Sequence, residues 1–155
     1  MADVEAMYHQ IQVAPEQRDA LRFFWWKNGD LSREPVTYRM KVHIFGGVWI
    51  PSCATYALRR TFHDHRSEFP DMVAKAEVNF YVDDLLMSLD PSNEASMLAC
   101  QLRRLLARGG FRLTKWASNH KGVLATIPTE ERQNALKEID LRQDKLPMER
   151  ALGVK

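Results

Sequence analysis

The sequence has few cysteines and no long hydrophobic run. Its 155 residues include two cysteines, Cys53 and Cys100, whose spacing matches neither a metal-binding motif nor a disulfide scaffold. We expect both to be buried free thiols in a reducing compartment. The apolar runs are too short for a transmembrane segment, and the N-terminus lacks the basic start and apolar stretch of a signal peptide. These absences predict a cytoplasmic chain with no membrane partner.

The sequence also lacks a strong net charge, which is +2, and it lacks acidic residues over one long stretch. No Asp or Glu occurs between Glu94 and Glu130, whereas this stretch contains six basic residues: Arg103, Arg104, Arg108, Arg112, Lys115 and Lys121. A local basic surface of this kind suits a phosphate backbone. The alternative is an ordinary solvated helix face.

The hydrophobic fraction of 45% and the charged fraction of 27% are typical of a globular domain, here covering residues 1–155. Alternation and aromatic content predict strands over residues 4–13, 21–26, 38–44, 78–82, 85–87 and 111–116. Apolar stripes and capping residues predict helices over residues 51–64, 70–78 and 91–108, and two short helices that begin at Asn119 and Thr129. The stripe of the first helix is Ala54, Leu58 and Phe62, and that of the third is Ala95, Leu98, Ala99, Leu102, Leu105 and Leu106. Residues 27–30, Lys-Asn-Gly-Asp, predict a turn. This order predicts an α+β fold, an antiparallel sheet with helices packed on one face.

Residues 81–84, Tyr-Val-Asp-Asp, place two adjacent carboxylates between apolar strands. Asp83 and Asp84 repel one another, and Asp disfavours strands, so the arrangement is costly. A cation bound between them would remove the cost, and oxygen ligands suit a hard cation such as Mg²⁺. The alternative is a polar hairpin turn, where Asp is common.

A third carboxylate, Asp3, lies at the start of residues 3–10. A strand placed beside the hairpin would bring Asp3 to the same cations. Three carboxylates are able to hold two metal ions ~4 Å apart, which is the arrangement used for in-line phosphoryl displacement. The alternative is that Asp3 is a plain surface residue.

Five segments, taken together and in order, resemble the motifs of retroelement reverse transcriptases. Residues 3–10 resemble motif A, 45–51 motif B, 81–84 motif C, 105–115 motif D and 152–153 the start of motif E. Five shorter stretches resemble the polyproteins of Bel/Pao-type LTR retrotransposons in their amino-acid sequence: residues 22–26, 45–49, 57–61, 113–116 and 149–154. The resemblance covers essentially the whole chain. It implies a polymerase palm-like fold with incomplete fingers and no thumb, a fragment of a larger polyprotein.

The resemblance implies an RNA-directed DNA polymerase that transfers dNTPs to a primer 3′-hydroxyl by two-metal chemistry. Its partners would be an RNA or DNA template with primer, and the remaining fingers, thumb and RNase H regions, in the cytoplasm or in virus-like particles. Because positioning supplies most of phosphoryl-transfer catalysis, we expect the isolated fragment to be nearly inactive. The alternative is an inactive retroelement remnant that acts only as a nucleic-acid-binding or protein-binding fold.

The resemblance also assigns the metal ligands. Asp3, Asp83 and Asp84 would be the catalytic residues and would hold two Mg²⁺ ions, or Mn²⁺, with the carbonyl of Val4 as an extra oxygen ligand.

Five further residues would bind substrate. Tyr8 matches the steric gate that excludes a 2′-hydroxyl, although a core tyrosine is the alternative. Phe45 and Gly46 would line the nucleotide pocket, where a missing side chain lets the backbone approach. Tyr81 would pack beneath the primer end. Lys115 would protonate pyrophosphate, and a surface lysine is the alternative.

Overall fold

The computed structural model describes residues 1–89, 92–137 and 141, which form an α+β fold in two compact units. The first unit contains Met1–Glu5 and Thr55–Lys155, and the second contains Ala6–Ala54. The expected start of motif E, residues 152–153, lies outside the described residues.

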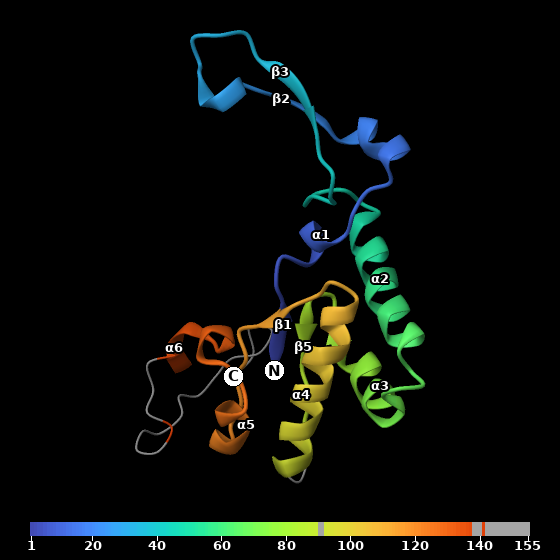
Figure 1. Cartoon of the computed structure of the whole chain (residues 1–155), viewed down its shortest axis with the longest axis vertical. Helices are drawn as coiled ribbons and strands as arrows, with labels where there is room; N and C mark the ends of the chain where they lie inside the picture. Colours follow the sequence, from blue (N-terminus) through green and yellow to red (C-terminus); the bar gives the residue numbers. More distant parts are fainter. Residues whose placement is uncertain (90–91, 138–140, 142–155) are drawn as a thin grey trace. The chain divides into compact units, whose positions relative to one another are not determined.

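The first unit is built on a four-stranded antiparallel sheet with the order β4-β5-β1-β6. Its strands are short: β1 (Ala2–Val4), β4 (Phe80–Tyr81), β5 (Asp84–Leu85) and β6 (Leu113–Thr114). The N-terminal strand β1 lies beside β5, a strand distant in sequence (Figure 1). The antiparallel sheet predicted from the sequence is confirmed.

The two faces of this sheet differ in polarity. Because side chains alternate along a strand, paired positions share a face. One face is apolar and buried, and it consists of Ala2, Val4, Leu85 and Leu113. The other face contains Asp3, Asp84 and Thr114, which are only partly buried. Burial of the first face therefore leaves the carboxylates on the polar side of the sheet.

The helices of the first unit provide most of its core. They are α3 (Pro70–Ala76), α4 (Ser92–Arg108), α5 (Lys121–Ala125) and α6 (Asn134–Lys137), with the 3₁₀ turns η3 (Glu77–Asn79) and η4 (Thr129–Glu131). The predicted stripe of α4 is buried at Leu98, Ala99, Leu102, Leu105 and Leu106, whereas Ala95, which was predicted to belong to it, is only half-buried. Among the described residues, no helix is long and apolar enough to cross a bilayer.

Helix α2 (Ile50–Asp64) begins in the second unit and ends in the first. Its predicted stripe of Ala54, Leu58 and Phe62 is buried. Pro51 occupies the first turn, where its missing N–H leaves no helical hydrogen bond unmade. Cys53 is a free thiol on this helix and Cys100 on α4, but both are partly exposed rather than buried.

The second unit contains a β-hairpin formed by β2 (Arg22–Trp25) and β3 (Val36–Arg39). Before it come α1 (Met7–Gln10) and the 3₁₀ helix η1 (Pro15–Leu21), and η2 (Lys27–Gly29) forms the predicted turn after β2. The return strand was predicted over residues 38–44. It instead ends at Arg39, and Val42 makes only an isolated bridge with Gln12.

Several other boundaries differ from the prediction. The strand predicted over residues 78–82 is reduced to β4, because the 3₁₀ turn η3 includes residues 77–79, and the strand predicted over residues 85–87 is β5, which begins and ends earlier. The strand predicted over residues 4–13 ends at Val4, because Ala6 adopts a left-handed backbone (φ 46°) and α1 follows. The strand predicted over residues 111–116 is confined to β6, because Lys115 is also left-handed (φ 52°). The helix expected from Asn119 begins at Lys121, and His120 caps it by accepting a hydrogen bond from the N–H of Gly122.

Candidate active site

The sheet register places Asp3 directly opposite Asp84. The two residues are Cα partners between β1 and β5, and the next residue, Val4, donates its N–H to the carbonyl of Asp83 at 2.8 Å. Side chains at directly opposed positions lie on the same face with Cβ atoms roughly 5 Å apart. Two carboxylates in this relation repel one another, so this pair is unfavourable for folding unless a positive charge is near.

Asp83 lies next to this pair, in the turn between β4 and β5. Tyr81 of β4 pairs with Asp84 of β5, which leaves Val82 and Asp83 as a two-residue turn. Val82 adopts φ 55°, a conformation that a β-branched residue rarely takes and that costs on the order of 1–3 kcal/mol. Backbone strain of this kind is concentrated at functional sites, and here it lies next to the carboxylates.

The electrostatics of the three carboxylates are shown by Asp84. Burial raises the pKa of Asp84 above its ordinary value, and the negative charges of Asp83 and Asp3 raise this pKa further. Only the charge of Lys115 lowers the pKa of Asp84. The site therefore has an excess of negative charge that a bound cation would relieve.

Lys115 lies at these carboxylates and not on a remote surface. Its Nζ donates to Oδ2 of Asp3 at 2.9 Å. This hydrogen bond raises the pKa of the Lys115 ammonium, and the charges of Asp83 and Asp84 add to the effect. The Lys115 side chain is 67% exposed, so solvent screens the ion pair and its contribution to stability is small.

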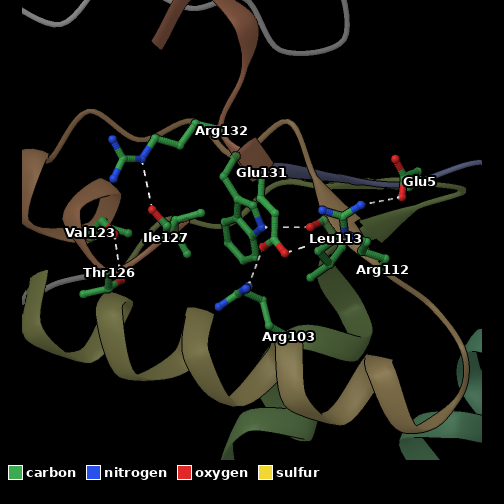
Figure 2. A network of polar contacts seen from close by, with 10 residues as sticks. Glu5, Arg103, Arg112, Leu113, Val123, Thr126, Ile127, Glu131 and Arg132 are labelled. Atoms are coloured by element: carbon green, nitrogen blue, oxygen red, sulfur yellow. Dashed lines mark hydrogen bonds and ion pairs between the residues drawn. The ribbon is translucent and has the colours of Figure 1, made fainter. Parts of the chain in front are cut away.

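A buried carboxylate, Glu131, ties the strand that leads to Lys115 into the fold (Figure 2). Glu131 is 9% exposed and accepts a hydrogen bond from Nε of Arg103 on α4 at 2.7 Å. Its second oxygen lies 3.6 Å from Nε of Arg112, and Nη1 of Arg112 donates a hydrogen bond to Oε2 of Glu5 at 3.2 Å.

Backbone hydrogen bonds reinforce these ion pairs on both sides of β6. The N–H of Glu5 donates to the carbonyl of Arg112 at 2.9 Å, and the N–H of Trp116 donates to the carbonyl of Glu131 at 2.9 Å. The segment that positions Lys115 is therefore held at both ends. Sequence reasoning missed this network, although one signal was available: Glu130 and Glu131 end the long stretch that contains only basic charges.

The remaining predicted residues fall in both units. Tyr81 belongs to the first unit and is exposed beside Asp84. Tyr8, Phe45 and Gly46 belong to the second unit. The rings of Tyr8 and Phe45 meet edge to face with centroids 4.8 Å apart, and Tyr8 is half-buried. Gly46 has φ 98°, a conformation that favours glycine.

The donor set fits a hard divalent cation in its chemistry. Asp3, Asp83 and Asp84 offer only carboxylate oxygens, which Mg²⁺ and Mn²⁺ prefer. Val4 has no side-chain oxygen, so an oxygen ligand from this residue would have to be its backbone carbonyl. Within the part of the chain that the structure describes, no group of three His, Cys, Asp or Glu side chains is already arranged to hold a metal ion. Binding would therefore require the carboxylates to turn inward and Lys115 to release Asp3.

No protein-family model and no curated protein matches this chain, so its function has to be inferred from the residues and the geometry described above.

Proposed function

We propose that this chain is the palm core of an RNA-directed DNA polymerase of a Bel/Pao-type retroelement. In the proposed reaction a primer 3′-hydroxyl, paired to an RNA or DNA template, attacks a dNTP and releases pyrophosphate. The sequence resemblance spans five motifs in order, and the fold supports it because the motif A and motif C segments are adjacent strands of one sheet.

The observation that carries the proposal is the cross-strand pair of Asp3 and Asp84. A shift of β1 by one residue would place Asp3 on the buried apolar face and Val4 on the polar face. The observed register instead puts Asp3 and Asp84 on the same open face, with Asp83 next to them in the turn, and the charges of Asp3 and Asp83 raise the pKa of Asp84. A bound divalent cation would relieve this cost, which supports the proposal.

Each site residue has a stated role in the proposal. Asp3, Asp83 and Asp84 would hold two divalent cations, which would supply activation of the primer hydroxyl and stabilisation of the leaving pyrophosphate. Lys115 is protonated at neutral pH and already lies at the carboxylates, so it is placed to donate a proton to the departing pyrophosphate.

The substrate-binding roles belong to residues of both units. The Tyr8 ring, held against Phe45, would exclude a 2′-hydroxyl from the nucleotide pocket. Gly46 would let the backbone approach the nucleotide, and Tyr81 would pack beneath the primer end. Alignment of primer and template would require fingers and thumb regions, so we expect the palm residues alone to extend a primer very slowly.

Metal binding is the first test, because it does not depend on regions outside the palm. We expect the chain to bind Mn²⁺, measured by loss of the free-ion electron paramagnetic resonance signal. Asp83→Asn, Asp84→Asn and Asp3→Asn should each weaken binding by about tenfold or more, since each removes one anionic ligand. Asp71→Asn, an exposed carboxylate on α3, is the matched control and should bind as the wild type does.

Primer extension is the second test, made in a chimera that supplies fingers and thumb from a Bel/Pao-type polymerase. Extension with dTTP on an oligo(dT)-primed poly(rA) template is expected. Loss of extension in Asp83→Asn but not in Asp71→Asn would support the proposal. Extension that is absent from the chimera, or is unchanged by Asp83→Asn, would reject it.

A second candidate is a retroelement remnant that binds nucleic acid or protein without catalysis. The observation that favours it is the Lys115–Asp3 ion pair, which neutralises one carboxylate without any metal. Absence of Mn²⁺ binding in both the wild-type chain and a Lys115→Met variant would decide for this second candidate.

A further inference from the structure

The hairpin of β2 and β3 is exposed on both of its faces. All eight residues of the two strands are exposed, and the described part of the chain provides no third strand for this sheet. Two-stranded hairpins are only marginally stable unless one face packs on something else. The chemistry of its two faces therefore indicates what kind of partner would bind there.

One face combines a bare aromatic ring with two arginines. Strand alternation places Arg22, Phe24, Thr37 and Arg39 on this face. The ring of Phe24 is the most exposed of the hairpin, at 71%. Arg22 and Arg39 are cross-strand partners, and both bond to Asp19, at 2.5 Å and 2.8 Å. Asp19 thus aligns two guanidinium groups next to an open ring and leaves this cluster with a net positive charge.

The surrounding segment is basic as well. Residues 18–41 contain six basic and three acidic side chains, and two of the three acids, Asp19 and Asp30, are paired with arginines. An apolar protein surface would have to bury the guanidinium groups of Arg22 and Arg39 with only one counter-charge, Asp19, between them, which is unfavourable. An anionic partner with flat apolar groups satisfies both the charges and the ring.

The opposite face gives the hairpin some rigidity. It consists of Phe23, Trp25, Val36 and Tyr38. The rings of Phe23 and Tyr38 are stacked, with their centroids 5.8 Å apart. Trp25 also meets Trp26 edge to face at 5.9 Å. Cross-strand aromatic pairs stabilise a hairpin, so the strand that presents Phe24 is held by rings behind it.

We propose that the Arg22–Phe24–Arg39 face binds an unpaired nucleic-acid strand. A base would stack on the Phe24 ring, and the adjacent phosphates would contact Arg22 and Arg39. An unpaired strand fits better than a duplex, because in a duplex the faces of the bases are already stacked. This inference does not rest on the proposed polymerase function, since none of the carboxylate residues takes part.

The experiment measures binding of the full chain to a fluorescent RNA of mixed sequence, about 12 nucleotides long, by anisotropy in EDTA. Phe24→Leu should weaken binding about tenfold, because it removes one stacking platform. Phe24→Trp should keep the affinity of the wild type, because it keeps an aromatic ring at this position. Tyr56→Leu removes a ring of similar exposure (68%) on α2 and should leave the affinity unchanged.

Two further arms separate stacking from charge. An abasic oligonucleotide of the same length should bind wild type and Phe24→Leu equally, since no base is left to stack. The double variant Arg22→Gln/Arg39→Gln should weaken binding and reduce the salt dependence, by about 1 to 2 in the slope of log affinity against log salt. Arg60→Gln, an exposed ion-paired arginine on α2, is the charge control.

Several outcomes would overturn this inference. An RNA affinity that Phe24→Leu leaves unchanged would do so. So would an equal loss of affinity in Tyr56→Leu, or a loss of affinity in Phe24→Leu that is also seen with the abasic oligonucleotide. A chain that ignores RNA but self-associates through Trp25 would make the hairpin an interface between copies. The RNA assay is made in EDTA and the Mn²⁺ assay without RNA, so failure of the polymerase proposal and failure of this one are distinguishable.

Discussion

Single side chains at the carboxylate site work against folding, and Asp84 shows this most clearly. Its pKa in the folded chain is raised above the ordinary value of 3.8. The folded state therefore binds the proton more tightly than the unfolded state does. Stability is then highest when the carboxyl is protonated, and it falls as the pH rises from about the ordinary pKa through the raised one.

Replacing Asp84 with asparagine should therefore stabilise the metal-free chain. At neutral pH and in EDTA, we expect Asp84→Asn to raise the melting temperature by about 1–3 °C, because it removes a charge that faces Asp3 and Asp83. At a pH below 3.8 the difference should disappear, since the wild-type carboxyl is then neutral. Circular dichroism melts at the two pH values measure this effect. A lower melting temperature for Asp84→Asn at neutral pH would contradict the electrostatic account.

Glu131 has the opposite role, because it holds two cationic side chains. We expect Glu131→Gln to lower the free energy of unfolding by about 1–3 kcal/mol, since Arg103 loses its anionic partner in a partly buried place. Glu130→Gln changes the exposed neighbouring carboxylate and should cost less than about 0.5 kcal/mol. Urea unfolding of the two variants makes the comparison. Equal stability of both would show that the network in Figure 2 contributes little.

At the scale of elements, the end of α4 depends on a close approach to α2. A Cβ added at Gly109 would lie 2.2 Å from Oγ1 of Thr61, which is itself buried and bonded to the carbonyl of Ala57. Gly110, the next residue, has open space around it and a positive φ of 80°. Glycine is therefore required at the two positions for different reasons: at position 109 a side chain would clash with Thr61, and at position 110 the backbone adopts a positive φ.

The two glycines should respond differently to alanine. Gly109→Ala is expected to destabilise the chain by about 1–3 kcal/mol through overpacking, and Thr61→Ala in the same chain should recover part of the loss. Gly110→Ala should cost about 1 kcal/mol from backbone strain, and Thr61→Ala should not rescue it. Urea denaturation of five variants, the three single ones and the two double ones, provides the two double-mutant cycles. Rescue of both glycine variants, or of neither, would argue against a specific contact with Thr61.

At the scale of the whole molecule, stability should differ between segments. The β2–β3 hairpin buries neither face, whereas Leu102, Leu105 and Leu106 of α4 are fully buried. Segments with few buried apolar contacts open with a small free energy, and core helices open only with global unfolding. We expect backbone amides of residues 22–25 and 36–39 to exchange with deuterium at least about tenfold faster than those of residues 102–106. Mass spectrometry of peptides from the labelled chain tests this, and equal protection would mean that the hairpin is covered.

The prediction from sequence succeeded where the signal was local. The stripe of α4 and the Asn28–Gly29 turn were both found, because a helix face and a turn are specified by residues close together in the chain. The prediction was wrong at residues 4–13, because the left-handed backbone of Ala6 has no sequence signal of the kind that glycine or asparagine provides. The Glu131 network was missed for a different reason, since its partners come from α4 and from the segment before β6.

The sequence by itself determined the residue types and the local elements: two adjacent carboxylates in a tight hairpin, a third near a short apolar strand, and aromatic strands with arginines between them. Only the tertiary structure decided that Asp3 pairs with Asp84 and that Lys115 donates a hydrogen bond to Asp3. It also decided that Glu131 forms an ion pair with Arg112, the residue before β6. The physical reason is that strand register follows from which face is buried. Burial of Val4 and Leu85 on one side of the sheet places the carboxylates together on the other.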